Sequence, residues 1–281
     1  MDFNYFDKLR DEIFQAIDGY APSSNPIFYE TLQTNFPGSL PMADYIKNTY
    51  KALNSYGFDK GKTIGMVAIC RDEITDILID EVIKYWGKTF NCCSLAGFVM
   101  MGRTGLAAAT DHTPIVDGIR RFTFYAMPHI AISRNGEIGK VYRDGIQKAS
   151  HACGALEAIV KELQSGFVPL MTDMQDIEQS IIRQKILSTI KYGDKPDLVE
   201  ITKLAGRIIS HDVAQLLSSL DSSIFNYAVM TGIQIHGPHD THWIYPQDFY
   251  VVGSDIPGGK KNLNEDSNWK INESEERSSK E

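Results

Sequence analysis

The sequence is poor in cysteine, in long apolar runs and in positive charge. Four cysteines in 281 residues are too few for a disulfide framework, so the thiols are expected to be core residues, metal ligands or catalytic groups. No apolar stretch reaches the roughly 18 to 20 residues of a membrane-spanning helix. The first residues lack the charged-then-apolar layout of a signal peptide. A net charge of -8 argues against nucleic acid or an anionic membrane surface as main partner. We therefore expect a cytoplasmic protein with no nucleic-acid and no membrane partner.

The composition is otherwise that of a globular protein, with 43% hydrophobic and 23% charged residues. Apolar positions with helical spacing predict a helical N-terminal segment, residues 1–57, packed on the core, with helices over residues 3–19 and 41–56. Residues 58–257 mix β-branched apolar runs with helical patterns, which predicts one α/β core. Residues 258–281 are polar and charged, which predicts a disordered tail.

The stretch from Thr63 to Trp86 organises this core. Its first residues, up to Ile69, form an apolar run that predicts a strand buried on both faces. Cys70 stands at the carboxyl end of this strand, and Asp72 is placed to cap the helix that follows. Ligands bind beyond such strand ends in open α/β sheets. A thiol and a carboxylate are therefore expected where a site would form.

The later segments predict a hairpin and a helical second half. Residues 128–132 and 139–143 read as two strands around an Arg-Asn-Gly turn. A helix is expected to open at residues 150–156 and to run to about residue 164. Helices over 174–190 and 197–220 and closing strands over 226–236 and 242–252 follow.

Two of the four thiols suit a metal site. Thiolate and imidazole ligands favour zinc, and a catalytic zinc site typically has three protein ligands and one open position. Cys70 and Cys153 lie beside polar residues at the boundaries of expected elements, so together they could supply two ligands. Cys92 and Cys93 lie inside an apolar run and are expected in the core.

Spacing leaves the third ligand open among His112, His129 and His151. In a regular helix His151 and Cys153 would project roughly 200° apart, which forbids shared coordination. His151 therefore qualifies only if the helix begins at about Cys153.

Several motifs together resemble one family. They are Cys70-Arg71-Asp72-Glu73, Gly102-Arg103-Thr104-Gly105, Met127-Pro128-His129-Ile130, Ala152-Cys153-Gly154-Ala155-Leu156 and Thr231-Gly232-Ile233-Gln234-Ile235-His236-Gly237. The thiol motifs are similar to the C-x-D-x-R and H-x-x-C-G patterns of the β-carbonic anhydrases. The full set, over roughly residues 40 to 255, resembles the low-CO2-inducible protein B family, also called the θ-class carbonic anhydrases.

The resemblance implies an α/β fold with a β-carbonic-anhydrase-like central mixed sheet flanked by helices. It also implies a homodimer and zinc as cofactor. By motif, Cys70 and Cys153 are the thiolate ligands and His129 is the imidazole. The β-class histidine position falls on Ser150, which leaves His151 as the alternative imidazole.

The resemblance also implies a role for Asp72. In the β-class the matching aspartate either approaches the metal or pairs with an arginine. The β-class arginine position falls on Ile74, so the partner is expected among Arg71, Arg103 and Arg143. His112 is a further candidate, as a proton acceptor towards solvent.

The function hypothesis is a carbonic anhydrase, a lyase that reversibly hydrates CO2 to bicarbonate through zinc-bound hydroxide. One alternative is a catalytically silent zinc protein that binds or senses CO2 or bicarbonate, or acts as a partner of inorganic-carbon proteins. Another is a thiol enzyme with Cys70 as nucleophile and a histidine base. This last reading leaves Cys153 and Asp72 unexplained.

Overall fold

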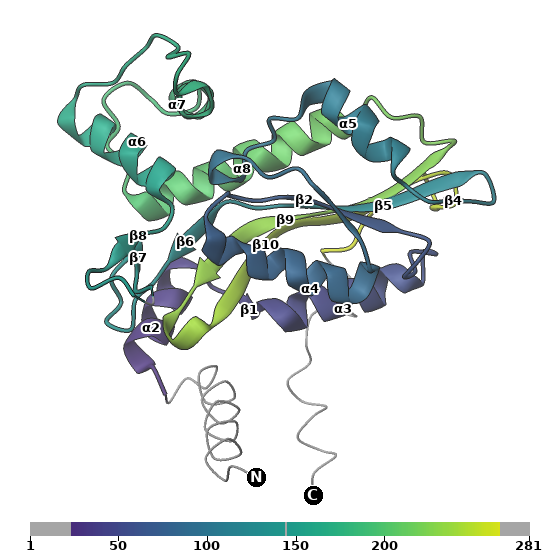
Figure 1. The fold of residues 1–281 in the computed structure, drawn as a ribbon, viewed down its shortest axis with the longest axis horizontal. Coiled ribbons are helices and arrows are strands. Elements are labelled where there is room, and N and C mark those ends of the chain that lie inside the picture. The colour runs from purple at the N-terminus through teal and green to yellow at the C-terminus, as the bar shows by residue number, and fades with distance from the viewer. Residues whose placement is uncertain (1–23, 144, 265–281) are drawn as a thin grey trace, which may run out of the picture.

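The computed structural model describes residues 24–143 and 145–264, and a mixed nine-stranded sheet runs through this part of the chain (Figure 1). The strands are β1 (Leu40–Pro41), β2 (Ile64–Ala68), β3 (Thr89–Asn91), β4 (Ile115–Val116), β5 (Ile119–Ala126), β6 (His129–Ala131), β9 (Phe225–His236), β10 (His242–Val252) and β11 (Lys260–Asn262). A separate two-stranded sheet pairs β7 (Lys140–Val141) with β8 (Ser150–His151). The helices are α2 (Pro26–Asn35), α3 (Met42–Asn54), α4 (Asp76–Trp86), α5 (Gly102–Asp111), α6 (Gly154–Ser165), α7 (Ile177–Leu187) and α8 (Leu198–Leu217).

The centre of the sheet is parallel and one side is antiparallel. The main order is β1-β10-β9-β5-β2-β3. Strands β3, β2, β5 and β9 run parallel, whereas β10 is antiparallel to both β9 and β1. Strand β6 continues beside β9 after β5 has ended. The carboxyl ends of β2 and β5 therefore meet at one edge of the sheet.

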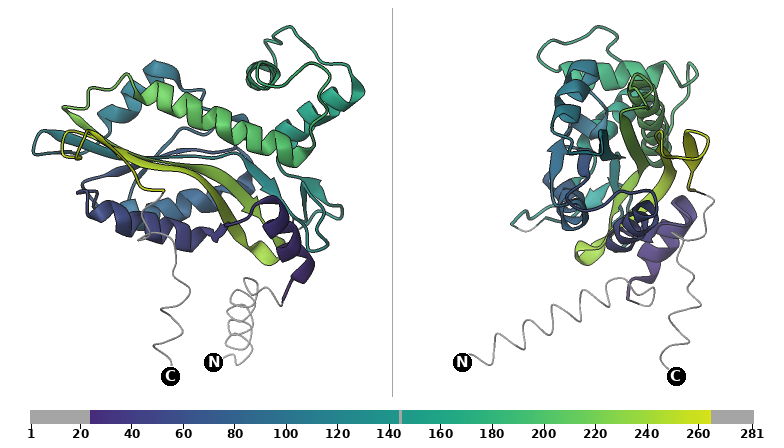
Figure 2. Two further views of the ribbon diagram at one scale, coloured as in Figure 1. Left: turned by 180° about the vertical axis from the view of Figure 1, so that it is seen from behind. Right: turned by 90° about the vertical axis from the view of Figure 1, so that its right-hand side faces the viewer.

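Helices cover both faces of the sheet, which confirms the predicted α/β architecture. Figure 1 shows α3 and α4 on one face and α5, α6 and α8 on the other, and Figure 2 shows the same layers from behind and from the side. Each interface has its own apolar cluster, one around Phe124, Leu156 and Ile209 and the other around Trp86 and Tyr125. Every residue of β2 is buried because it lies between these two layers.

Local sequence signals set the helix ends. Helix α8 begins with a capping box in which Asp197 accepts from the backbone N–H of Glu200, and Glu200 accepts from that of Asp197. Helices α4 and α6 end at Gly87 and Gly166, which have φ of 80° and 75°. A residue with a Cβ rarely adopts this left-handed conformation, so glycine suits both ends.

The structure differs from the sequence expectation in the hairpin at 128–143. Between its two arms, a single isolated antiparallel bridge joins Ile132 to Ile138. Strand β6 pairs instead with β9, and β7 pairs with β8. For β6 the physical reason is that the buried edge of β9 beyond the end of β5 offers backbone groups that must be hydrogen-bonded.

The ends of the chain also differ from the predicted division. Residues 260–262, placed in the polar tail, form β11 on the edge of β10, and Leu263 is buried. The predicted helix over residues 3–19 and the rest of the tail, residues 265–281, lie outside the described residues.

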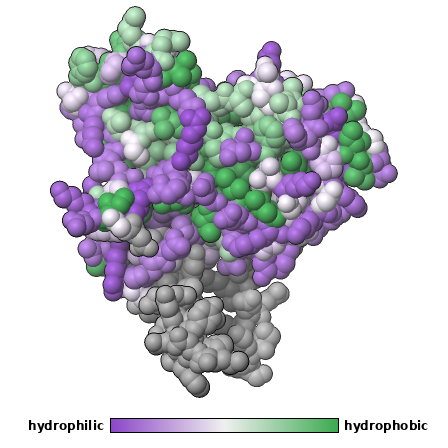
Figure 3. All heavy atoms as spheres, viewed as in Figure 1, coloured by the Kyte–Doolittle hydropathy of each residue, from purple (hydrophilic) through white to green (hydrophobic). Residues whose placement is uncertain are grey.

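The segment between α6 and α7 carries exposed apolar side chains. Phe167, Leu170, Met171 and Met174 each have at least three quarters of their surface exposed, and Figure 3 shows hydrophobic residues on the surface at this end of the molecule. Among the described helices, none combines the length and the apolar character that crossing a membrane requires.

Candidate metal centre

Two thiols and one imidazole meet at the carboxyl edge of the parallel strands. Cys70 follows β2, His129 begins β6 and Cys153 is the N-cap residue of α6. One ligand atom from each lies within 4.8 Å of the others, and Cys70 Sγ is 3.9 Å from Cys153 Sγ. All three residues are buried, with 4%, 0% and 1% of their surface exposed.

The sheet brings these residues together through backbone contacts. Parallel pairing of Ala68 with Ala126 places the ends of β2 and β5 side by side, and the Met127 N–H donates to the Ala68 carbonyl at 3.1 Å. Gly97 fits between these strand ends, where a Cβ would meet the carbonyl oxygen of Met127. Cys70 and His129 are thus fixed by the two strands that precede them.

The third ligand is tied to the same edge from a distant part of the chain. The Ala131 N–H of β6 donates to the Ala152 carbonyl at 3.3 Å, and the Ala152 N–H donates to the Gly139 carbonyl at 3.1 Å. Cys153 follows directly and begins α6, so its sulfur lies at the positive end of a helix. The segment around residue 152 is thereby fastened beside His129.

The donor atoms fit a tetrahedral metal ion. Two sulfurs at about 2.3 Å from a tetrahedral zinc lie about 3.8 Å apart, close to the separation found. His129 Nε2 is a buried polar atom without a hydrogen-bond partner in the described structure. A native protein rarely leaves such an atom unsatisfied, so a ligand is expected there. Two sulfurs and one nitrogen are the donor set that zinc favours.

The electrostatics of the two thiols are linked. A hydrogen bond with Cys153 is the main cause that lowers the pKa of Cys70, and His129 lowers it further. The same contact with Cys70, together with burial, raises the pKa of Cys153. The Cys70 thiol is thus the more readily ionised of the two, and a bound cation would favour the thiolate form of both.

Asp72 is held beside this group by an arginine. Asp72 Oδ1 lies 2.5 Å from Arg143 Nη2, and Asp72 Oδ2 lies 3.9 Å from His129 Nε2. Arg143 also contacts Glu73 Oε1 at 2.5 Å and the Ser150 hydroxyl. Asp72 occupies the expected N-cap position, before the short helix Glu73–Thr75, but its side chain makes no capping bond and pairs with Arg143 instead.

A family model for the limiting CO2-inducible proteins B/C beta carbonic anhydrases matches residues 39–253. The chain belongs to the LCIB/LCIC family. A crystal structure of limiting CO2-inducible protein LCIB is 30% identical, with a TM-score of 0.67, and the match covers 83% of this chain and 97% of that chain. A homolog of LCIB is 25% identical, with a TM-score of 0.71 and coverage of 83% and 98%. No curated protein gave a significant match. The resemblance found in the sequence is confirmed.

Within this LCIB-type core, the other candidate residues lie elsewhere. Arg71 forms a two-pronged pair with Glu178, with its Nη2 2.8 Å from Oε1. Arg103 is exposed in the first turn of α5. His112 is exposed at the end of α5, with its ring 5.4 Å from that of Phe90. The geometry joins none of these three to the thiols.

His151, the alternative imidazole, contacts two charged side chains. Its Nδ1 pairs with Glu157, and its Nε2 lies 3.4 Å from Lys140 Nζ. The helix begins after Cys153, so the helical argument against His151 does not apply. Instead, Glu157 and Lys140 take up its two ring nitrogens.

Sequence reasoning missed a row of residues behind His129. His129 Nδ1 lies 3.2 Å from His236 Nε2, and His236 Nδ1 lies 3.0 Å from His242 Nδ1. His242 Nε2 lies 3.0 Å from Asp240 Oδ1. Burial lowers the pKa of both His236 and His242. The two predicted closing strands held the signal, because an antiparallel pair with a short loop sets residue 236 opposite residue 242.

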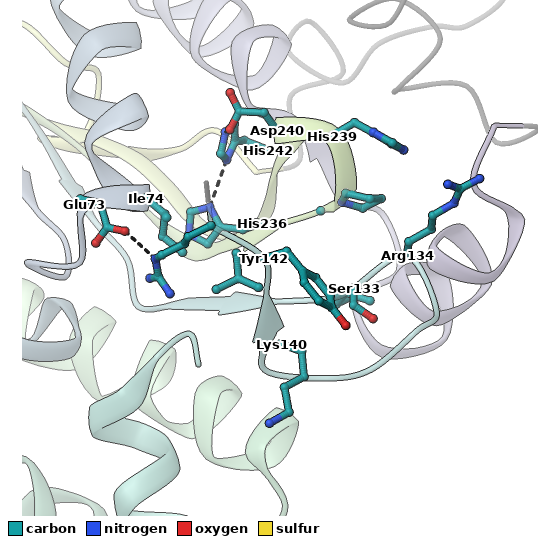
Figure 4. Close-up of a pocket in the computed structure, with 15 residues that line it drawn as sticks. Glu73, Ile74, Ser133, Arg134, Lys140, Tyr142, His236, His239, Asp240 and His242 are labelled. Atoms are coloured by element: carbon teal, nitrogen blue, oxygen red, sulfur yellow. Dashed lines mark hydrogen bonds and ion pairs between the residues drawn. The ribbon is translucent and has the colours of Figure 1, made fainter. Parts of the chain in front are cut away.

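A cleft of about 1120 Å³ borders this centre (Figure 4). It is lined on one side by Glu73 and Arg143 and on another by His236, Asp240 and His242. Arg143 contacts Asp72, and His236 contacts His129. The cleft therefore reaches the residues that surround the candidate metal ligands.

Proposed function

We propose that the protein is a zinc-dependent carbonic anhydrase that catalyses the reversible hydration of CO2 to bicarbonate. The observation that carries the proposal is the buried Cys70, His129 and Cys153 group, whose ligand atoms lie within 4.8 Å of one another in an LCIB-family core. Zinc, when bound, lowers the pKa of a water molecule to roughly 7, which makes hydroxide available at neutral pH. The three residues would hold the ion and leave one position for the reacting water.

The residues around the group support this chemistry. Two thiolates cancel the charge of the metal, so neighbouring groups must keep the water acidic. Arg143 holds one oxygen of Asp72 and adds a positive charge, which reduces the tendency of the carboxylate to become a fourth ligand. The second oxygen of Asp72 lies 3.9 Å from His129 Nε2, so the carboxylate lies beside the residues that would hold the ion.

The experiment combines metal analysis with stopped-flow CO2 hydration on full-length protein purified under reducing conditions. We expect about one zinc per chain and hydration well above the uncatalysed rate, with both lost in Cys70→Ser and Cys153→Ser. Cys92→Ser, in the apolar core, is the matched control and should keep both. If the protein held about one zinc per chain but hydrated CO2 only at the uncatalysed rate, the carbonic anhydrase proposal would be wrong and the silent zinc protein would be favoured. Alkylation-sensitive activity without zinc would favour the thiol enzyme.

The cytoplasmic location and the homodimer remain predictions from the sequence. The same preparation, examined by light scattering, tests the dimer.

A further inference from the structure

Three histidines and an aspartate form a continuous hydrogen-bonded row that starts at His129. The nitrogen pairs along the row are separated by 3.2 and 3.0 Å, and the last nitrogen lies 3.0 Å from Asp240 Oδ1. The three imidazoles are buried, with 0%, 3% and 8% of their surface exposed, whereas the Asp240 side chain is 93% exposed. Figure 4 shows His236 and His242 joined in this way beneath Asp240. The row therefore links the candidate metal centre to the protein surface.

The Asp240 carboxylate determines which nitrogen donates and which accepts in each hydrogen bond of the row. An ionised carboxylate only accepts hydrogen bonds, so His242 Nε2 must carry a hydrogen. In neutral His242, Nδ1 is then an acceptor, and His236 must donate to it from its own Nδ1. His236 Nε2 is in turn an acceptor, so His129 must donate from Nδ1. The hydrogen on Nδ1 leaves the lone pair of His129 on Nε2, the nitrogen that has no partner and faces the thiols.

If every hydrogen bond along the three histidines ran the other way, His129 could not bind a metal ion through Nε2. If His129 Nδ1 accepted a hydrogen bond, neutral His129 would carry its hydrogen on Nε2 and would have no lone pair for a metal ion. Neutral His236 and His242 would then also reverse, and His242 Nε2 would present a lone pair to the Asp240 carboxylate 3.0 Å away. Two acceptors at this distance repel each other. Asp240 thus favours the first set of tautomers, and its effect reaches His129 through the rings of His236 and His242.

We propose that His236 and His242, anchored by Asp240, are positioning residues that fix His129 in the Nδ1–H tautomer and aim its Nε2 at the metal. The inference rests on the zinc site proposed above, and it assigns roles to three residues outside the metal triad. A hydrogen-bonded partner behind a ligating histidine commonly changes metal affinity by about 10- to 100-fold. Here the final partner is an exposed residue of the short helix Pro238–Asp240.

The first test reads the tautomer directly in the reduced, metal-free full-length Cys70→Ala variant, because a Cys70 thiolate without zinc would itself accept a hydrogen bond from His129. Long-range 1H–15N correlation spectra distinguish protonated from unprotonated ring nitrogens. We expect His129 and His236 to be protonated on Nδ1 and His242 on Nε2. Asp240→Asn should leave His129 in a mixture, because an amide can donate as well as accept. His129 protonated on Nε2 in the Cys70→Ala variant that retains Asp240 would overturn the proposal. Because no metal and no substrate are involved, this readout stands apart from carbonic anhydrase activity.

The second test measures zinc affinity by competition with a chelator. His236→Leu removes both hydrogen bonds at similar volume and should weaken zinc binding by about 10- to 100-fold. His236→Gln keeps an acceptor for His129 and a donor for His242, and should restore most of the affinity. His239→Ala, in the same turn but outside the row, is the control.

A double-mutant cycle tests whether Asp240 affects zinc affinity through His236 or only through a general effect on folding. Asp240→Ala should weaken zinc binding in the unmodified background and have no further effect in His236→Leu, because its influence passes through His236. Additive effects, or equal losses in His236→Leu and His236→Gln, would overturn the proposal. Zinc binding that follows these expectations without CO2 hydration would contradict the proposed function and leave the positioning roles intact.

Discussion

Asp72 and Arg143 are 71 residues apart in the chain, yet one carboxylate oxygen lies 2.5 Å from one guanidinium nitrogen beside the candidate metal ligands. Each side chain is 15% exposed, so water screens the pair only partly. Arg143 comes from the segment after β7, and among the three arginines expected as partners it is the one that pairs with Asp72. The carboxylate is therefore controlled by a residue from another part of the fold.

Arg143→Ala should lower CO2 hydration by about 10-fold or more while zinc content stays near that of the unmodified protein. Without Arg143, Asp72 is no longer restrained and is close enough to compete for the metal. Stopped-flow assays and metal analysis measure the two effects. Arg71→Ala is the matched control, because Arg71 pairs with Glu178 instead.

The loss of CO2 hydration in Arg143→Ala should occur only when Asp72 carries its carboxylate. In Asp72→Asn the side chain no longer carries a negative charge, so adding Arg143→Ala should change hydration little. If the two substitutions reduced hydration independently, Arg143 would act by some route other than restraining Asp72.

His129→Ala should abolish zinc binding, whereas His151→Ala should leave zinc content unchanged. His129 Nε2 has no protein hydrogen bond in the described structure, while Glu157 and Lys140 engage both nitrogens of His151. Metal analysis after dialysis against a zinc buffer measures the difference. Retained zinc in the first variant and lost zinc in the second would reverse the assignment.

Gly97→Ala should destabilise the fold by about 1–3 kcal/mol more than Gly118→Ala, measured by urea unfolding of reduced protein. Both glycines have positive φ, 76° and 79°, so both substitutions carry similar backbone strain. A Cβ at Gly97 would press on the Met127 carbonyl between the strand ends, whereas a Cβ at Gly118 has nothing within 4 Å. Equal losses would show that this close approach is unimportant for stability.

Removing zinc should lower the melting temperature. Zinc would connect Cys70, His129 and Cys153, which belong to three separate segments, and an unfolded chain cannot hold the three ligands in place. Free zinc at 100 times its dissociation constant would stabilise the folded state by about 2.7 kcal/mol. Thermal unfolding with and without zinc tests this, and Cys153→Ser should show no zinc-dependent shift. A shift of the same size in that variant would mean that zinc binds elsewhere.

The sequence was informative where local pattern decides structure. The apolar run before Cys70 forms β2, and the small residues after Cys153 open α6, so both thiols could be placed at element boundaries. The parallel pairing of β2 with β5, which brings Cys70 and the residues after β5 to one edge of the sheet, was not part of the prediction.

The arginine partner of Asp72 and the histidines behind His129 could not be predicted, because both depend on side chains from distant segments that meet only in the folded protein. The choice of Arg143 over Arg71 depends on how the segment after β7 lies against Asp72, and no spacing rule encodes that. The row behind His129 depends on β6 adding to β9, whereas turn chemistry alone favoured a hairpin with residues 139–143. The predicted turn forms and is closed by the Ile132–Ile138 bridge, but the partner of each longer strand segment is set by tertiary contacts that turn residues do not encode.

The near-complete burial of Cys70, His129 and Cys153 has a kinetic consequence. A chelator is too large to reach a metal ion at such ligands without a local opening of the surrounding segments. Zinc loss should then proceed at a rate that is independent of chelator concentration, set by how often the protein opens, while a gas as small as CO2 faces no comparable delay.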